Sequence, residues 1–327
     1  LLRRSLLSEG GTVAAVQIDD RPSYWWGLQG GDPLFVDYSP RIIGEAGRPG
    51  LYQRWLAEEY GDIGRLNERY GTHYDAFGEV QPPRRPPAAA GELAWFSDWR
   101  RCKMHLLNQH LEFLYDWLRT GGIDVPIAVL YPYQVPLAAR YCADYFRRRE
   151  KPILVALGAD LHISAEHHAD ELGLGQAVGM AELARCWVKE AGLPPTSLET
   201  PGATSARAPA AGVEALCVLQ LGHGLNALSL SPMVGGENPP GSGLAHGRLC
   251  DRGAPIGPYG DPRPHFEAVR RLGQFLALHG PRLLRTEPLA DVAFGWYEPY
   301  EDCGQHGDMR LVGWRDDYRD MLTSRFG

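Results

Sequence analysis

Short apolar runs recur along the chain and alternate with stretches whose apolar residues follow helical spacing. Strand-like segments lie at residues 13–18, 127–131, 153–157, 196–199 and 227–230, and the first three of them are almost entirely apolar. Continuous apolar runs of this length are typical of strands buried on both faces of a parallel sheet. The predicted helices that follow the later runs span residues 137–149, 177–191, 213–221 and 265–279. This alternation predicts an α/β protein with a parallel sheet and crossover helices.

The region between the first two predicted strands has a pattern of its own. Residues 21–40 are rich in Gly, Pro and aromatic residues and are expected to form a long loop. Residues 51–60 place their apolar side chains on one helical face, and Asp62 is positioned to cap a second short helix. A proline-rich connector at 82–87 precedes a long helix that we expect to end at Gly121.

Composition excludes several classes of protein. The hydrophobic fraction of 44% supports a substantial core, and the net charge of −7 argues against a protein that coats nucleic acid. No apolar run is long enough to span a bilayer. The six cysteines form no CxxC pair, so we expect buried free thiols, with a cytoplasmic location favoured and secretion left open.

Nothing in the sequence requires a metal or a cofactor. The glycine-rich stretch at 235–243 lacks the Lys-Ser/Thr pair of a phosphate-binding loop. The histidine group at residues 162–168 has the spacing of a polar loop after a strand, so no metal site is predicted. The sequence leaves a homo-oligomer open.

Two predicted strands end on carboxylates. Glu199 ends the run at 196–199 and is followed by Pro201-Gly202, and the first strand ends at Asp19-Asp20. In a parallel barrel, catalytic groups are displayed at the carboxyl ends of strands. Two carboxylates on separate strand ends are what cleavage of a glycosidic bond requires, one as nucleophile and one as proton donor. Polar residues are also common at strand ends without any catalytic role.

Four segments resemble the glycoside hydrolases of families 35 and 42, the retaining β-galactosidases with a (β/α)₈ barrel. Residues 10–20 (GGTVAAVQIDD) resemble the fourth strand of that family, which usually reads GGPIIAVQxENE. Residues 52–72 are similar to the family 42 insertion after this strand. Residues 235–238 (GGEN) resemble the GGTN motif after strand eight, and residues 251–260 are similar to its YDAPI motif and the following Tyr-Gly.

The resemblance implies a fold, a domain plan and a reaction. The chain would be a C-terminal fragment that carries about strands four to eight of the barrel, which agrees with five predicted strands. Residues 1–285 would form this partial catalytic domain with an insertion at about 22–95, and residues 286–327 would begin a β-rich appendage. The enzyme would hydrolyse terminal β-galactosides without a cofactor, and Glu199 matches the family nucleophile.

The acid/base position departs from the family pattern. The family's Asn-Glu pair aligns with Asp20-Arg21, and arginine does not release its proton near neutral pH. In one interpretation the register slips, so that Asp19 takes the Asn role and Asp20 becomes the acid/base. Aspartate is one methylene shorter than glutamate, which would widen the ~5 Å carboxyl separation of retaining enzymes. In the alternative interpretation, the protein is a degenerate relative that binds carbohydrate without cleaving it.

Further residues are predicted to contact the sugar. Aromatic rings are flat and apolar and suit the C–H faces of sugars, and polar groups suit the hydroxyls. The predicted substrate-binding residues are Asp19, Trp25, Tyr131, Tyr133, Asp160, Asn226 and Glu237. The expected partner is therefore a carbohydrate, and neither nucleic acid nor a membrane is expected.

Overall fold

The structure is a computed structural model of the chain, and it divides into two compact units. The residues that it describes are 2–20, 22, 37–45, 48–85, 87–132, 136–158, 181–182, 185–186, 188–190, 192–201, 210–241, 249–250 and 254–289. The first unit contains residues 2–20 and the described residues from 118 to 289, and the second contains residues 22–117 as far as they are described. The predicted appendage beyond residue 289 lies outside the described residues.

The first unit is built on a parallel sheet of five strands, which follow one another across the sheet in chain order. The strands are β1 (Val16–Asp20), β2 (Ile127–Pro132), β3 (Leu154–Gly158), β4 (Thr196–Pro201) and β5 (Ala227–Ser231). All five predicted strands are confirmed, although β1 begins three residues later than expected. A parallel sheet wound in chain order, with helices between the strands, is the arrangement that repeated βα units produce.

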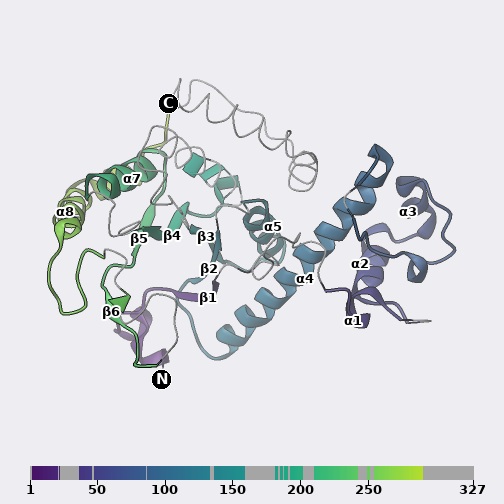
Figure 1. Cartoon of the computed structure of the whole chain (residues 1–327), viewed down its shortest axis with the longest axis horizontal. Coiled ribbons are helices and arrows are strands. Elements are labelled where there is room, and N and C mark those ends of the chain that lie inside the picture. The colour runs from purple at the N-terminus through teal and green to yellow at the C-terminus, as the bar shows by residue number, and fades with distance from the viewer. Residues whose placement is uncertain are drawn as a thin grey trace. The chain divides into compact units, whose positions relative to one another are not determined.

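Helices cover the outer side of this sheet in Figure 1. They are α5 (Pro136–Arg147), α7 (Ala210–Gly222) and α8 (Pro264–Leu283). The α5 helix packs on β2 and β3, whose central residues are almost fully buried. Leu228 and Leu230 of β5 pack against a cluster of Val213, Cys217 and Leu272 from α7 and α8. The intervening residues of β5 are exposed, so this strand presents an apolar face to the helices and a small, polar face to the other side.

Short elements complete the first unit. Two 3₁₀ turns, η1 (Leu2–Ser5) and η2 (Leu7–Glu9), flank Leu6, which is buried against Ile123 and Val125. After β5 the chain forms an antiparallel pair between β6 (Gly236–Glu237) and β7 (Leu249–Cys250). Among the described helices of the whole chain, none combines the length and apolarity needed to cross a bilayer.

The second unit is helical. It contains α1 (Pro40–Ile43), α2 (Leu51–Tyr60), α3 (Ile63–Tyr70), the short turns η4 (Phe77–Glu79) and η5 (Ala90–Glu92), and most of α4 (Leu93–Thr120). The predicted cap of α3 is confirmed, because the Asp62 carboxylate accepts hydrogen bonds from the backbone amides of Gly64 (2.8 Å) and Arg65 (3.3 Å). The core surrounds Trp99, whose ring meets Tyr52 edge-on with centroids 5.1 Å apart.

A buried carboxylate lies beside this aromatic core. Asp98 of α4 is 4% exposed and accepts hydrogen bonds from the hydroxyls of Tyr60 (2.5 Å) and Tyr70 (2.8 Å) through Oδ2. Its other oxygen accepts a bond from Arg101 at 3.2 Å. Burial is the main reason that the pKa values of Tyr60 and Tyr70 are raised, and the nearby carboxylate adds to the effect. Asp98 therefore joins α2, α3 and α4 through polar contacts inside an otherwise apolar unit.

Candidate active site

The two predicted catalytic positions lie at the same edge of the sheet. The strands are parallel, so their carboxyl ends meet at one edge, where β1 ends at Asp20 and β4 passes through Glu199. The backbone of Asp20 pairs with Leu130, and Glu199 pairs with Gly158, which itself pairs with Pro132. Glu199 therefore stands two residues, ~7 Å, further along the sheet than Asp20.

The sheet must be curved for these two strands to serve one ligand. Two strands, β2 and β3, lie between β1 and β4, and strands are spaced ~4.8 Å apart, so the two backbones lie ~14 Å apart measured along the sheet. Retaining glycosidases need carboxyl groups only ~5 Å apart. Curvature toward a barrel shortens the direct path between the strand ends and allows side chains to converge inside it.

Both strands are irregular at their acidic residues. The pairing of β1 with β2 shifts between Gln17 and Asp19, and the pairing of β4 shifts against both neighbours between Ser197 and Thr200. Extra residues of this kind are common next to active sites because they redirect a strand locally. No residue pattern along the chain predicts either irregularity.

The acidic end of β1 is organised by local hydrogen bonds. The Asp19 carboxylate accepts a bond of 2.7 Å from the backbone amide of Asp20, and the Gln17 side chain donates to the Asp19 carbonyl at 3.0 Å. Asp19 is half-buried, whereas Asp20 is exposed. An exposed carboxylate next to one held by the backbone is compatible with the assignment of Asp20 as the proton donor and Asp19 as a supporting residue, and both roles stay predictions.

Two of the predicted sugar contacts are placed differently from each other. Tyr131 is near the carboxyl end of β2, but it has no exposed surface, and its burial raises its pKa, with the Cys142 thiol of α5 adding to the effect. Asn226 precedes β5 and donates its backbone amide to the carbonyl of Pro195 at 2.7 Å. Both Asn226 and Pro195 lie at the amino edge of the sheet, opposite Asp20 and Glu199. The structure therefore places Asn226 at the edge opposite the two carboxylates, whereas Tyr131 lies at their edge, beside the residue that pairs with Asp20, with its side chain buried.

Glu237 has a neighbour, Tyr259, that was not among the predicted site residues. Glu237 lies in β6, which follows the carboxyl end of β5, and its carboxylate accepts a hydrogen bond from the Tyr259 hydroxyl. Tyr259 is 76% exposed, so its ring is accessible to a ligand. The only signal in the sequence was the match of residues 259–260 to the family motif. Trp25, Tyr133, Asp160 and Arg21 lie outside the described residues.

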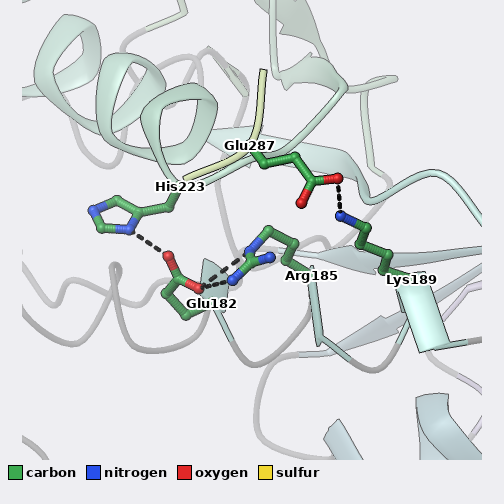
Figure 2. Close-up of polar contacts among 5 residues, drawn as sticks. All are labelled: Glu182, Arg185, Lys189, His223 and Glu287. Atoms are coloured by element: carbon green, nitrogen blue, oxygen red, sulfur yellow. Dashed lines mark hydrogen bonds and ion pairs between the residues drawn. The ribbon is translucent and has the colours of Figure 1, made fainter. Parts of the chain in front are cut away.

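A second polar group centres on Glu182, and its member His223 lies between the end of α7 and the start of β5 (Figure 2). Glu182 Oε1 lies 2.8 Å from His223 Nδ1, and Glu182 Oε2 accepts a bond of 2.6 Å from Arg185 Nη2. Lys189 donates to Glu287 at 2.5 Å. Burial would raise the pKa of Glu182, but the bonds from His223 and Arg185 outweigh burial and lower it. These contacts join the described helical residues among 181–182, 185–186 and 188–190 to the end of α7 and to the residues after α8, and they are sufficiently explained by packing.

The described side chains contain no group of three or more His, Cys, Asp or Glu residues placed to hold a metal ion. Among the described residues, the carboxylates near the carboxyl edge include those of Asp19, Asp20 and Glu237. The backbone of Glu199 lies at the same edge. This set can exchange protons and attack an electrophilic carbon.

Comparison with known proteins relates this arrangement to carbohydrate-active enzymes. The family model of glycoside hydrolase family 42, described as beta-galactosidase, matches residues 46–228. An exo-beta-D-glucosaminidase of Pyrococcus horikoshii is 32% identical over 303 residues, which are 92% of this chain and 37% of that protein. The enzyme of the same description from Thermococcus kodakarensis is 30% identical with the same coverage. The chain thus spans less than two fifths of the length of these relatives.

Solved structures show the same fold. The beta-galactosidase of the psychrophilic Marinomonas ef1 superposes with a TM-score of 0.50 at 14% identity, over 72% of this chain and 38% of that one. An exo-beta-agarase superposes with a TM-score of 0.51 at 12% identity, over 82% of this chain and 35% of that one. At this identity the likeness concerns the fold alone. The family model, in contrast, covers more than half of the chain, and the chain belongs to glycoside hydrolase family 42.

Proposed function

We propose that this chain carries the acid/base and the nucleophile of a retaining exo-β-glycosidase. The observation that carries the proposal is the presence of Asp20 and Glu199 on two strands of one parallel sheet, both at its carboxyl edge. Family membership supports the same reaction class. The assignment to family 35, the partial barrel and the roles of individual residues remain part of the proposal.

The mechanism would be a double displacement. A Glu199 carboxylate oxygen forms a bond to the anomeric carbon while the bond to the leaving oxygen breaks, and Asp20 gives that oxygen its proton. Asp20, now ionised, takes a proton from water as the water attacks the same carbon and releases Glu199. Two displacements retain the configuration of the anomeric carbon. The polar, exposed side of β5 and the Glu237–Tyr259 pair would offer contacts for hydroxyl groups.

A β-D-glucosaminide is the first candidate substrate. Two relatives with this activity in their descriptions are 30% and 32% identical over 92% of the chain. Glucosamine carries an ammonium group in its protonated form, which a carboxylate attracts. Asp19 is a second carboxylate beside the proposed acid/base and would suit this group. The chain's net charge of −7 also favours a cationic sugar over an anionic one.

A terminal β-galactoside is the second candidate. The description of the matching family model favours it. The two candidates differ in the group at C2, where a hydroxyl carries no charge. A non-catalytic, carbohydrate-binding protein is the third candidate, because Arg21 stands where the family places a glutamate.

Hydrolysis of nitrophenyl glycosides by the full-length protein distinguishes these three candidate functions. We expect release of nitrophenol from the β-D-glucosaminide at a higher kcat/KM than from the β-galactoside, with the β-anomer formed first in proton NMR spectra. Glu199→Gln should abolish the activity. The matched control is Glu214→Gln, which changes a surface carboxylate of α7 that pairs with Arg271 at 2.6 Å. A Glu199→Gln variant with normal activity, or no hydrolysis of any β-glycoside by the intact protein, would contradict the proposal.

A further inference from the structure

The hydrogen bonds around the β4 bulge concern the residue that we propose as nucleophile. Leu157 pairs with Ser197 and Gly158 pairs with Glu199, so β4 uses one residue more than β3 over this step. The same comparison with β5 gives the same result, because Ser197 pairs with Leu228 and Thr200 with Leu230. The additional residue therefore belongs to β4 and lies between Ser197 and Thr200.

The side chains at the ends of this bulge point to the same face. In a regular strand, residues three apart point to opposite faces. Here the hydroxyls of Ser197 and Thr200 are 2.9 Å apart, and both side chains are fully buried. The Thr200 hydroxyl also lies 3.1 Å from Oε1 of Gln220, a residue of α7 that is 1% exposed. The bulge is thus anchored on the helix-covered face of the sheet.

The donors in this chain of contacts follow from chemistry. A hydroxyl carries one hydrogen and the amide oxygen of Gln220 can only accept, so Thr200 donates to Gln220 and accepts from Ser197. All three groups are buried, and a buried polar network is stable only when its members satisfy one another. Replacing any member removes at least one hydrogen bond from this buried network, which disturbs the backbone between Ser197 and Thr200.

A bulge locally disrupts the hydrogen bonds between neighbouring strands, which would otherwise fix the backbone. A residue within it needs another source of rigidity, and a nucleophile needs to be held within ~0.5 Å of its productive position. We propose that Ser197, Thr200 and Gln220 are positioning residues for Glu199, which hold the β4 bulge through a hydrogen-bonded link to α7. This inference rests on the proposed role of Glu199.

The test uses Thr200→Val in the full-length protein, because valine keeps the shape of threonine and removes the hydroxyl. The readout is the rate of covalent labelling by an activated 2-fluoro glycoside at saturation, together with kcat and KM, at a temperature at which thermal melts show the variant folded. Displacing a catalytic group by ~1 Å can lower the reaction rate by ~10²-fold, so we expect the labelling rate and kcat to fall ~10–100-fold. KM should change less than about threefold, since sugar binding does not depend on the bulge. Thr200→Ser, which keeps the hydroxyl, should restore the rate.

The control is Thr196→Val in the same strand. Thr196 is also buried, and its hydroxyl donates to the Pro194 carbonyl at 3.1 Å, at the amino end of β4. We expect its labelling rate to stay within about threefold of the wild type. If Thr200→Val does not fold, Ser197→Ala decides the matter, with an expected fall of ~3–10-fold.

Three results would overturn the inference: a folded Thr200→Val variant with the wild-type rate, equal losses for Thr196→Val and Thr200→Val, or a wild-type rate for Ser197→Ala. Failure of the proposed function is separate and recognisable, because Glu199→Gln would then remain active or the wild type would show neither hydrolysis nor labelling. An inactive Glu199→Gln with a fully active Thr200→Val would refute the positioning role and leave the nucleophile in place.

Discussion

Asp98 provides a sharp prediction about the stability of the helical unit. Asp98→Ala would leave two tyrosine hydroxyls without this acceptor and would remove one carboxylate partner of Arg101, which also pairs with Glu59. A hydrogen bond to a charged group contributes ~1.5–3 kcal/mol, and the bond from Arg101 adds less than ~1 kcal/mol because that side chain is 38% exposed. The expected loss in the free energy of unfolding is therefore about 3–5 kcal/mol, as for other broken buried pairs.

Urea unfolding followed by tryptophan fluorescence measures this loss, since Trp55 and Trp99 belong to the core of the same unit. A double-mutant cycle with Tyr70→Phe isolates one bond, and its coupling energy should exceed ~1 kcal/mol. The control is Asp62→Ala, which removes an exposed helix cap worth ~1 kcal/mol. If Asp98→Ala were no more destabilising than Asp62→Ala, the carboxylate would not be a stabilising centre, and the reasoning from burial would be refuted.

Two further predictions concern the sheet unit. The pKa of Glu182 is lowered in the folded protein, so the contribution of its carboxylate to stability is present above the unfolded pKa and is lost as the pH falls through the folded pKa. The melting temperatures of wild type and Glu182→Gln should therefore differ at pH 7 and converge below about pH 4. A difference that does not change with pH would contradict this. Asp20→Asn should reduce hydrolysis of glycosides with poor leaving groups by ~10²–10⁴-fold and spare those with very acidic phenols. Equal losses on both would exclude Asp20 as the acid, and a gain in activity for Arg21→Glu would then favour the degenerate relative.

Local signals in the sequence were sufficient for the elements of the fold. Continuous apolar runs identified the first three strands, and shorter strand-like segments between turn residues identified the last two. Asp62 and Gly121 marked helix boundaries close to those observed, since α4 ends at Thr120. The first strand was placed three residues early, because Val13 is as apolar as Val16 but forms only an isolated bridge with Leu6. Apolar character alone does not distinguish a strand from the extended segment that leads into it.

The candidate site was predicted less completely, for a physical reason. We expected residues near the strands to face the ligand. Whether a residue does so depends on which end of the strand it lies at and on which face of the sheet its side chain occupies. Asn226 lies at the amino end of β5, and Tyr131 is buried beside α5. The burial of Tyr131 depends on tertiary packing, which no local sequence pattern encodes. The β4 bulge and its link to Gln220 likewise arise from contacts between residues 20 positions apart.

We propose Glu199 as the nucleophile of a retaining glycosidase, and covalent labelling tests this role. The most direct measurement incubates the full-length protein with a 2-fluoro β-glycoside that carries an activated leaving group, followed by digestion and mass spectrometry of the peptides. The account predicts one added glycosyl group per chain, on the peptide that contains Glu199, with loss of activity in proportion to labelling. A label on another residue of an active protein, or rapid turnover of substrate with no covalent adduct and an inverted product, would contradict it.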